Sequence, residues 1–196
     1  DVKDFFEKYS WCNHLMFTGG SPTMNPKLCD EIVTLFNKIH LIRLEKGVVT
    51  LETEGSHFIK TEWPIDLISL SPKFSNSIPK LGIEKPLGGL VDQKFVDQHN
   101  KYRLNKEAIK QLIEYHTDYH FKPVCNPIEQ PETWAEIEAF RIEMNIPKTK
   151  TWIMPPGSTK EEILRVLPDV INFCGENGYN FSGRDHIIAF GEKREV

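Results

Sequence analysis

Short apolar runs alternate with longer amphipathic stretches along almost the whole chain, and this alternation limits the fold more than any other feature. The apolar runs predict strands at 14–18, 48–53, 65–70, 121–125, 151–154 and 186–190. The amphipathic stretches predict helices at 25–39, 106–115, 133–144 and 158–177, and residues 1–9 are expected to end a further helix. Alternating strands and helices are typical of parallel strands joined by helical crossovers. We therefore predict an α/β fold with mostly parallel strands.

The strand pattern leaves two architectures open. An incomplete, modified α/β barrel and an open doubly wound sheet both fit, because short apolar runs suit strands that are buried on both faces. In both architectures, chemistry gathers at the carboxyl ends of the strands. Distinctive residues lie at the ends of four predicted strands, at 18–20, 52–55, 71–73 and 154–155. Their recurrence predicts one shared site.

Local signals mark where helices begin and end. Asn25-Pro26 opens one helix, since proline already has the backbone angle of a first helical position. Ser158 and Glu161 form a predicted capping box for the last long helix, and Gly178 supplies its left-handed stop. Residues 74–105 show no sustained period, so they are expected to form either a lid or binding loop or a poorly ordered insertion.

Composition and charge exclude several classes of protein. A chain of 196 residues suits a single domain, spanning 1–196, that can bury a core without disulfides. The formal net charge of −4 argues against a protein that neutralises nucleic-acid phosphates over a broad surface. No apolar run is long enough to span a bilayer, and no signal segment opens the sequence, so we expect a cytoplasmic protein.

The cysteines and histidines predict no metal site of their own. Cys12, Cys29, Cys125 and Cys174 are too far apart in sequence for the C-x-x-C spacing of zinc or iron–sulfur sites. We expect all four to be reduced structural residues. His116 and His120 have the spacing of two metal ligands on one helix face, but no third ligand is evident.

Five stretches match the motifs of one enzyme family in the same order. Residues 18–22 (T-G-G-S-P) resemble the T-G-G-E-P motif of radical S-adenosylmethionine enzymes. Residues 51–56 (L-E-T-E-G-S) and 69–73 (S-L-S-P-K) resemble the E-T-N-G-T strand end and the S-P-K motif of 7-carboxy-7-deazaguanine synthases. Residues 152–157 (W-I-M-P-P-G) resemble their L-M-P-x-G turn, and residues 178–196 resemble their terminal R-L-H-I…W-G-x-K-R-G-V. The ordered set is specific, and it covers the chain from residue 12 onward.

This resemblance implies a set of binding residues and no catalytic side chain. The residues expected to contact S-adenosyl-L-methionine are Gly19, Gly20, Ser71, Pro72 and Lys73. Glycines suit this role because a ligand can approach a backbone that carries no Cβ. The residues expected on the substrate side are Thr18, Glu52, His186 and the terminal carboxylate of Val196. Without the resemblance, Arg184 and His186 would be interpreted as a surface pair on the last predicted strand.

The fold and reaction implied by the resemblance are those of the family. The fold is an incomplete barrel of the radical S-adenosylmethionine type, and the assembly is a homodimer. A reduced [4Fe–4S] cluster cleaves S-adenosyl-L-methionine, and the radical formed takes hydrogen from 6-carboxy-5,6,7,8-tetrahydropterin. Assisted by Mg²⁺, the ring then contracts to 7-carboxy-7-deazaguanine, a queuosine precursor, with loss of ammonia, as in a carbon–nitrogen lyase. An electron donor such as flavodoxin or ferredoxin is also implied.

Several positions depart from the family pattern. Ser21 replaces the glutamate of the T-G-G-E-P motif, and Glu54, Asp185 and Glu195 replace asparagine, leucine and glycine. More seriously, the cluster-binding C-x-x-x-C-x-x-C loop is absent, together with a neighbouring threonine that the family uses for Mg²⁺. The sequence begins at Asp1 rather than at methionine, so we expect a domain that is incomplete at its N-terminus and inactive by itself.

Two alternatives stay open at the level of sequence. A related radical S-adenosylmethionine enzyme of the activase type would share the T-G-G motif without the C-terminal match. A non-catalytic relative would keep the fold and lack the cluster loop in its complete form. The residues that precede Asp1 would distinguish this last alternative from the enzymes.

Overall fold

The computed structural model describes residues 2–19, 22–42, 46–84 and 88–191. The chain divides into two compact units, and each is described by itself. Unit 1 comprises residues 1–72 and 102–120, and unit 2 comprises residues 73–101 and 121–196. The prediction of one domain over the whole chain stays a prediction. No described helix has both the length and the apolar composition needed to cross a membrane.

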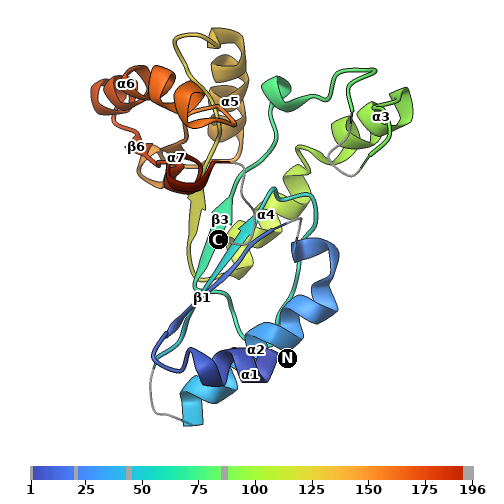
Figure 1. The fold of residues 1–196 in the computed structure, drawn as a ribbon, viewed down its shortest axis with the longest axis vertical. Helices are drawn as coiled ribbons and strands as arrows, with labels where there is room; N and C mark the ends of the chain where they lie inside the picture. Colours follow the sequence, from blue (N-terminus) through green and yellow to red (C-terminus); the bar gives the residue numbers. More distant parts are fainter. Residues whose placement is uncertain (1, 20–21, 43–45, 85–87, 192–196) are drawn as a thin grey trace. The chain divides into compact units, whose positions relative to one another are not determined.

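Unit 1 is built on parallel strands. β1 (His14–Phe17), β2 (Val48–Thr53), β3 (Leu67–Leu70) and β4 (Tyr119–Phe121, whose last residue belongs to unit 2) lie in that order in one sheet. In the parallel register, Phe17 pairs with Leu51 and Glu52 pairs with Ser69. The helices are α1 (Val2–Lys8), α2 (Pro26–Ile42) and α4 (Lys106–Tyr115), with a 3-10 turn, η1 (Pro22–Met24), before α2. Figure 1 shows these elements along the chain.

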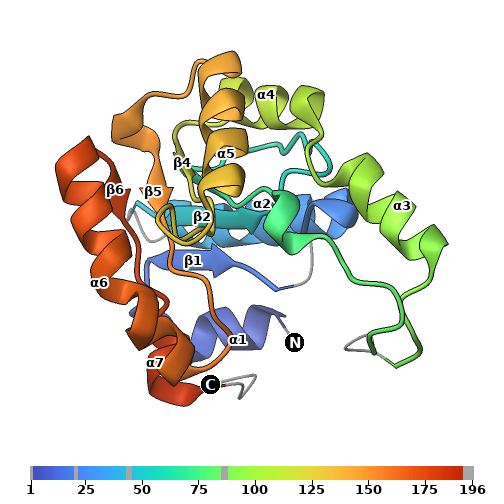
Figure 2. The same ribbon diagram turned by 90° about the horizontal axis from the view of Figure 1, so that it is seen from above.

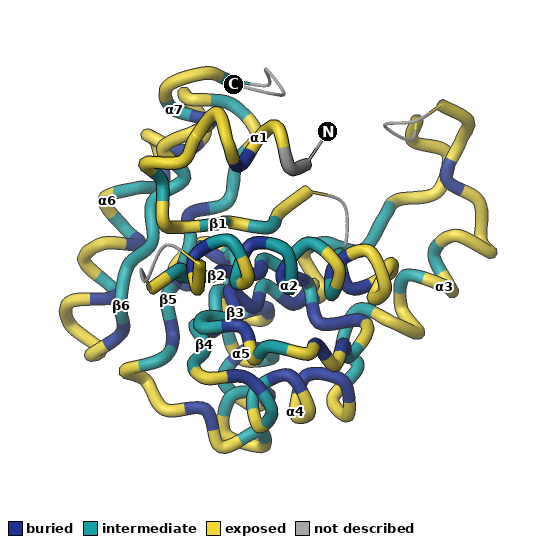
Figure 3. Tube along the Cα trace, turned by 90° about the horizontal axis from the view of Figure 1, so that it is seen from below, coloured by how far each residue is buried: buried dark blue, intermediate teal, exposed yellow. Residues whose placement is uncertain are grey.

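The core of unit 1 lies on the helix-facing side of the sheet. Residues that alternate along a strand face opposite sides, so Val49 and Leu51 of β2 share a face with Ile68 and Leu70 across the register. All four side chains are fully buried. The buried helix residues of this unit are Cys29, Val33 and Phe36 of α2 and Ala108, Ile109 and Leu112 of α4. The buried segments of β2 and β3 are dark blue in Figure 3.

The crossover from β2 to β3 contains no helix, although right-handed crossovers are usually helical. Residues 54–66 instead bond to the two helices. The Glu62 backbone N–H donates to Asp30 Oδ1 of α2 at 2.6 Å, and Tyr115 of α4 donates its hydroxyl to the Thr61 carbonyl at 2.8 Å. The irregular crossover therefore lies on the same side of the sheet as α2 and α4.

Unit 2 consists mainly of helices around two very short strands. Its elements are η2 (Ser75–Ser77), α3 (Gln93–Tyr102, whose last residue belongs to unit 1), α5 (Pro131–Glu143), η3 (Lys148–Lys150), β5 (Trp152–Ile153), α6 (Lys160–Asn177), β6 (Asn180–Phe181) and α7 (Asp185–Phe190). β5 and β6 pair in parallel, and single parallel bridges join Phe121 to Thr151 and Val124 to Met154. Figure 2 shows α6, β5 and β6 from above.

Aromatic side chains fill much of the interior of unit 2. The ring of Phe74 packs edge-on against Phe140 and Phe121, with centroids 5.6 and 6.1 Å apart. Trp134 contacts the rings of Phe173 and Tyr179 at 5.0 and 5.2 Å beside the buried Ile153–Val170–Cys174 cluster. Such ring pairs stabilise a fold beyond the area they bury.

The structure confirms most predicted elements and corrects others. β2 and α4 have the predicted bounds, and Gly178 ends α6 with φ +72°. The capping box is wrong by one residue: Thr159 and Glu162 form it, and Ser158 precedes it. The segment 74–105 is not without regular structure, because it contains η2 and α3. Asp92 accepts from the Phe95 backbone N–H at 2.8 Å and so starts α3.

Candidate active site

Polar side chains meet at the carboxyl ends of β1 and β2. Thr18 follows β1 directly and donates its hydroxyl to Glu52 Oε2 at 2.7 Å. Ser69 is the register partner of Glu52 on the next strand, and its Oγ lies 3.5 Å from Glu52 Oε1. Two of the predicted substrate-side residues, Thr18 and Glu52, are therefore in contact, and Ser69 is a neighbour that sequence reasoning did not single out.

The alternation of β2 explains why Glu52 faces away from the core of unit 1. Leu51 and Thr53 are buried on the helix-facing side, which leaves Thr50 and Glu52 on the opposite face. His14 of β1 lies on that same face, with its Nε2 2.8 Å from Thr50 Oγ1. This face of the sheet thus carries hydroxyl, imidazole and carboxylate groups, whereas the other face carries the core.

Gly19 begins the turn after β1 in a backbone conformation that suits glycine. Its φ is +89°, and a Cβ built there would meet no atom within 4 Å, so the space over the backbone is open. A cavity of about 190 Å³ lies at this turn. Its lining residues are Phe17, Thr18, Gly19, Pro22, Asn25, Leu28 and Cys29. Gly20, predicted to contact the cofactor, lies outside the described residues.

The Ser71-Pro72-Lys73 segment divides at the boundary of the two units. Ser71 is half-buried, and its backbone N–H donates to the Thr53 carbonyl at 2.8 Å, which continues the β2–β3 pairing. Pro72 is buried, whereas Lys73 is exposed and is the first residue of unit 2. The structure thus places Ser71 beside the carboxyl end of β2, and it leaves the roles of these three residues as predictions.

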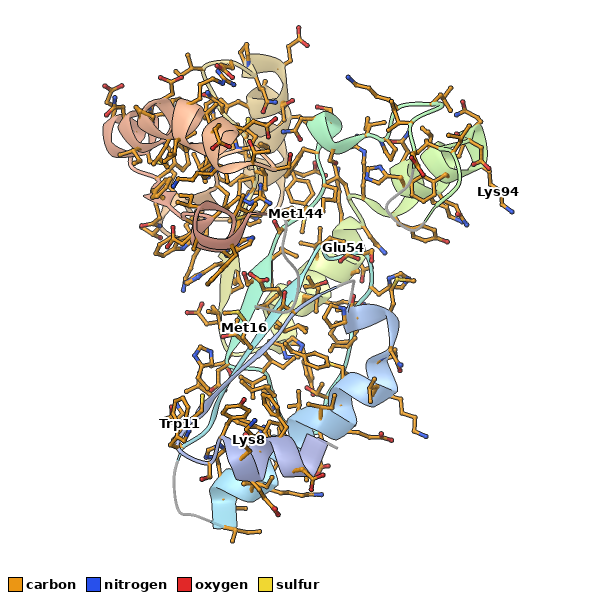
Figure 4. The ribbon with its side chains drawn as sticks, viewed as in Figure 1. Lys8, Trp11, Met16, Glu54, Lys94 and Met144 are labelled. Atoms are coloured by element: carbon orange, nitrogen blue, oxygen red, sulfur yellow. The ribbon has the colours of Figure 1, made fainter. Side chains whose placement is uncertain are left out.

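A second polar group forms where residues 54–57 leave β2. Ser56 donates its hydroxyl hydrogen to Glu54 Oε1, so the 2.8 Å contact between Ser56 Oγ and His57 Nδ1 needs the imidazole as donor. Asn105 donates to the Ser56 carbonyl at 2.9 Å. Figure 4 shows Glu54 at the carboxyl end of the unit 1 strands, opposite Trp11 at their start. Sequence reasoning placed Glu54 and Ser56 in the strand-end motif 51–56 without a role of their own, and it did not single out His57 or Asn105.

The last predicted strand is wrong, and His186 lies in a helix. Residues 185–190 form α7, and His186 is exposed in its first turn. The strand that pairs with β5 is β6, because Asn180 and Ser182 donate their backbone N–H groups to the carbonyls of Thr151 and Ile153 at 3.0 Å. Arg184 is half-buried rather than on the surface. Val196, the last predicted substrate contact, lies outside the described residues.

The cysteines of this chain do not fit an iron–sulfur cluster. All four are free, and Cys29, Cys125 and Cys174 are buried. Burial raises the pKa of the Cys29 thiol to about 11, helped by nearby Asp30, and that of Cys125 to about 12. Cluster ligands must be thiolates, and a thiol with a raised pKa stays protonated. The structural role predicted for these three residues agrees with their burial.

The two histidines do not share a helix face, because His116 follows the end of α4 and His120 lies in β4. His116 accepts the Ile65 backbone N–H on its Nδ1 at 3.1 Å, which leaves that nitrogen engaged. Burial lowers the pKa of His116 to about 4, against a weaker opposing effect of the Ile59 backbone. Within the described ranges, no group of three or more histidine, cysteine or acidic residues could hold a metal ion.

Comparison with curated proteins confirms the resemblance inferred from the motifs. The chain is 27% identical over 199 aligned residues, all of this chain, to the 7-carboxy-7-deazaguanine synthase of Halobacterium salinarum, and it covers 72% of that protein. It is 26% identical to the synthase of the same name from Rhodopirellula baltica, of which it covers 64%. The relative from Pyrobaculum aerophilum is 23% identical, and 67% of it is covered. No protein-family profile matches the chain.

Solved structures confirm the fold class. Histidine-tagged anSMEcpe with bound AdoMet superimposes with a TM-score of 0.51 at 17% identity over 87% of this chain, and the chain spans 47% of that protein. Native anSMEcpe with bound AdoMet and the Cp18Cys peptide gives a TM-score of 0.51 at 16% identity, with 93% and 54% covered. The fold is therefore α/β, of the radical S-adenosylmethionine type, and the described sheets do not close into a barrel.

Proposed function

We propose that the protein acts as a 7-carboxy-7-deazaguanine synthase, which contracts 6-carboxy-5,6,7,8-tetrahydropterin to 7-carboxy-7-deazaguanine with loss of ammonia. The reaction balances, because the product is the substrate less one NH₃. The observation that carries the proposal is the hydrogen-bonded Thr18–Glu52 pair at the ends of adjacent parallel strands. It occurs in a chain whose three curated relatives all bear the name of this enzyme.

The Thr18–Glu52 pair suits a substrate that presents N–H groups. Thr18 gives its one hydroxyl hydrogen to Glu52, so its oxygen can only accept further hydrogen bonds in this arrangement. The Glu52 carboxylate also accepts, and the two together offer an edge of acceptors. A tetrahydropterin carries ring N–H and amino groups that match such an edge. The exposed His186 imidazole is proposed as a further contact, as the resemblance implies.

Gly19 and Ser71 fit S-adenosyl-L-methionine, because one offers an open backbone and the other a half-buried hydroxyl. Together with Gly20, Pro72 and Lys73 they are the residues proposed to hold it. When bound at a reduced cluster, this cofactor supplies the radical that removes hydrogen from the substrate.

The [4Fe–4S] cluster does not fit the cysteines of these 196 residues, so we propose that its ligands lie outside them and that the chain alone is inactive. Mg²⁺, an electron donor and a homodimer belong to the proposal on the strength of the resemblance.

The test uses the complete, cluster-loaded protein with both small molecules. Glu52→Gln keeps the shape of the side chain and removes its charge. Product formation should fall about tenfold to hundredfold, because a hydrogen bond to a charged group contributes about 1.5–3 kcal/mol. Cleavage of S-adenosyl-L-methionine, measured as 5′-deoxyadenosine, should persist. Glu62→Gln, an exposed carboxylate on the β2–β3 crossover, is the control. Wild-type protein that cleaves the cofactor without forming 7-carboxy-7-deazaguanine would refute the proposal.

A further inference from the structure

Two arginines of unit 2 show how this fold normally holds a guanidinium. Arg141 donates from Nε and Nη2 to the two oxygens of Glu138, at 2.7 and 3.0 Å. Arg165 likewise donates to both oxygens of Glu129. Each arginine thus forms the two-pronged carboxylate contact for which its planar geometry is suited. The hydrogen bond to the partner carboxylate is also the main cause that raises the pKa of each of these arginines.

Arg184 lacks such a partner although it is half-buried. Its Nη1 donates to the Gly157 carbonyl at 2.6 Å, and it forms no other hydrogen bond or ion pair with the residues that the structure describes. A guanidinium has five N–H donors, so most of those of Arg184 have no partner among the described residues. Burial lowers the pKa of Arg184. Taking a cation out of water without a counter-charge is costly, so a half-buried guanidinium is usually paired.

Two carboxylates, one beside Gly157 and one next to Arg184 in sequence, have contacts of their own. Glu162 accepts the backbone N–H groups of Ser158 and Thr159 at 2.7 and 3.2 Å, as part of the α6 cap. Asp185 lies over Gly183, where a Cβ would meet its Oδ1 at 2.6 Å. Neither Glu162 nor Asp185 forms an ion pair with Arg184 in the described part of the chain.

The support of Arg184 is well defined. Gly157 has φ +141°, and a Cβ there would come within 3.0 Å of Glu162 Cβ and Ile163 Cγ1, so the turn is tightly packed. The turn that follows and α7 also line a cavity of about 360 Å³. Arg184 is held at this turn by its hydrogen bond to Gly157, and it directly precedes α7, which lines the cavity.

We propose that Arg184 binds the carboxylate of a ligand through the two-pronged contact that Arg141 and Arg165 make within the fold. This inference rests on the proposed function, which involves two carboxylates: that on the pterin ring and that of S-adenosyl-L-methionine. Either one supplies the planar, negatively charged partner that Arg184 lacks. Arg184 is thus a binding residue, and its hydrogen bond to the Gly157 carbonyl orients the guanidinium.

Matched ligand pairs isolate the carboxylate. Binding to the complete protein is measured for pterin-6-carboxylate and for pterin, which lacks only the carboxylate. It is also measured for S-adenosyl-L-methionine and for decarboxylated S-adenosylmethionine, which lacks only the carboxylate. Arg184→Gln should weaken the carboxylate-bearing member of one pair about tenfold to hundredfold and leave the other member unchanged. The pair that responds identifies the source. Arg184→Lys keeps the positive charge but not the planar two-pronged geometry. It should weaken binding of the carboxylate-bearing member by less than Arg184→Gln does.

Arg165→Gln is the control, because Arg165 already has its own carboxylate partner. This variant should not change the ratio of affinities within either ligand pair. Equal weakening of both members of a pair, or no change in either pair, would overturn the inference and leave the proposed function standing. A wild-type protein that binds none of the four compounds would overturn both. Folding is followed in parallel. The Tm of ligand-free Arg184→Gln should equal or exceed that of the wild type, since the glutamine can still donate to Gly157 and carries no uncompensated charge.

Discussion

The two units place their polar side chains in opposite ways. In unit 1, Thr18 and Ser69 both bond to Glu52 on one face of a parallel sheet, while the other face holds the core. In unit 2, most polar contacts secure helices: Thr159 and Glu162 cap α6, and Arg141 holds Glu138 within α5. This difference predicts that substitutions in the polar group of unit 1 should change ligand binding, whereas those in the polar contacts of unit 2 should change stability. Arg184 is the residue of unit 2 that departs from this division.

Gly55 should be the most sensitive position of the sheet unit. Its φ is +79°, and a Cβ would lie 2.6 Å from Ile109 Cγ1 and 2.8 Å from Leu70 Cδ1, both in the core. Gly55→Ala combines left-handed strain with overpacking and should lower the free energy of unfolding by about 3 kcal/mol.

Gly178→Ala in unit 2 is the matched control for Gly55→Ala. Gly178 has φ +72°, but a Cβ added there would meet no atom within 4 Å, so only the strain of about 1 kcal/mol should appear. Urea unfolding measures both variants. Equal losses would show that packing at Gly55 contributes nothing.

The two units should also lose stability in different ranges of pH. Burial lowers the pKa of His116 in unit 1 to about 4 from an ordinary 6.5. The unfolded chain therefore binds this proton before the folded one, and stability falls as the pH drops from 6.5 to about 4, by about 2–3 kcal/mol. His116→Asn, which can still accept from Ile65, should flatten the slope of unfolding free energy against pH. An unchanged slope would contradict the assignment.

The contribution of Glu138 in unit 2 to stability should be lost at lower pH than that of His116. Burial opposes its ionisation, but the hydrogen bonds from Arg141 hold the pKa of Glu138 below its ordinary value. Its contribution is present above the unfolded pKa near 4.5 and is lost as the pH falls through the lower folded value. Arg141→Gln should cost about 2 kcal/mol at neutral pH, because the half-buried carboxylate loses its partner. Arg165→Gln, at an exposed pair, should cause no measurable change.

The smallest effect should come from the cap of α6. Thr159 accepts the Glu162 backbone N–H at 3.2 Å, and Thr159→Ala should lower stability by about 1 kcal/mol. Ser158→Ala tests the alternative cap predicted from the sequence. If Ser158→Ala were the more damaging of the two, the box would begin one residue earlier than the structure has it.

The sequence predicted unit 1 well because its signals are local and strong. The β-branched run of β2 and the Asn25-Pro26 start of α2 each indicate one structure. The Thr18–Glu52 contact was within reach for the same reason, since both residues end or follow paired strands. Ser69 was missed because its importance lies only in being the register partner of Glu52.

Unit 2 was harder to predict because its short elements depend on tertiary partners. Residues 186–190 (H-I-I-A-F) are rich in apolar residues and suit a strand or a helix equally. The neighbours decide: Asn180–Phe181 already pairs with β5, and the following residues form α7. Likewise α3 lacks a buried face, so its period was weak, although Asp92 offered a capping signal. The sequence does not reveal that Arg184 has no carboxylate partner among the described residues, because this depends on where acids distant in sequence lie in the fold.

The discontinuity of unit 1 has a consequence for biosynthesis. The core of unit 1 includes Ile109 and Leu112 of α4. Residues 73–101, which precede α4 and β4 in sequence, belong to unit 2. On a ribosome, β1 to β3 would emerge with part of their apolar face uncovered until about residue 120 is free. The parallel pairing of strands far apart in sequence adds to the delay, since such contacts form slowly. A nascent chain stalled between residues 72 and 101 should therefore be a ready substrate for chaperones, and no single cut can release unit 1 as one continuous fragment.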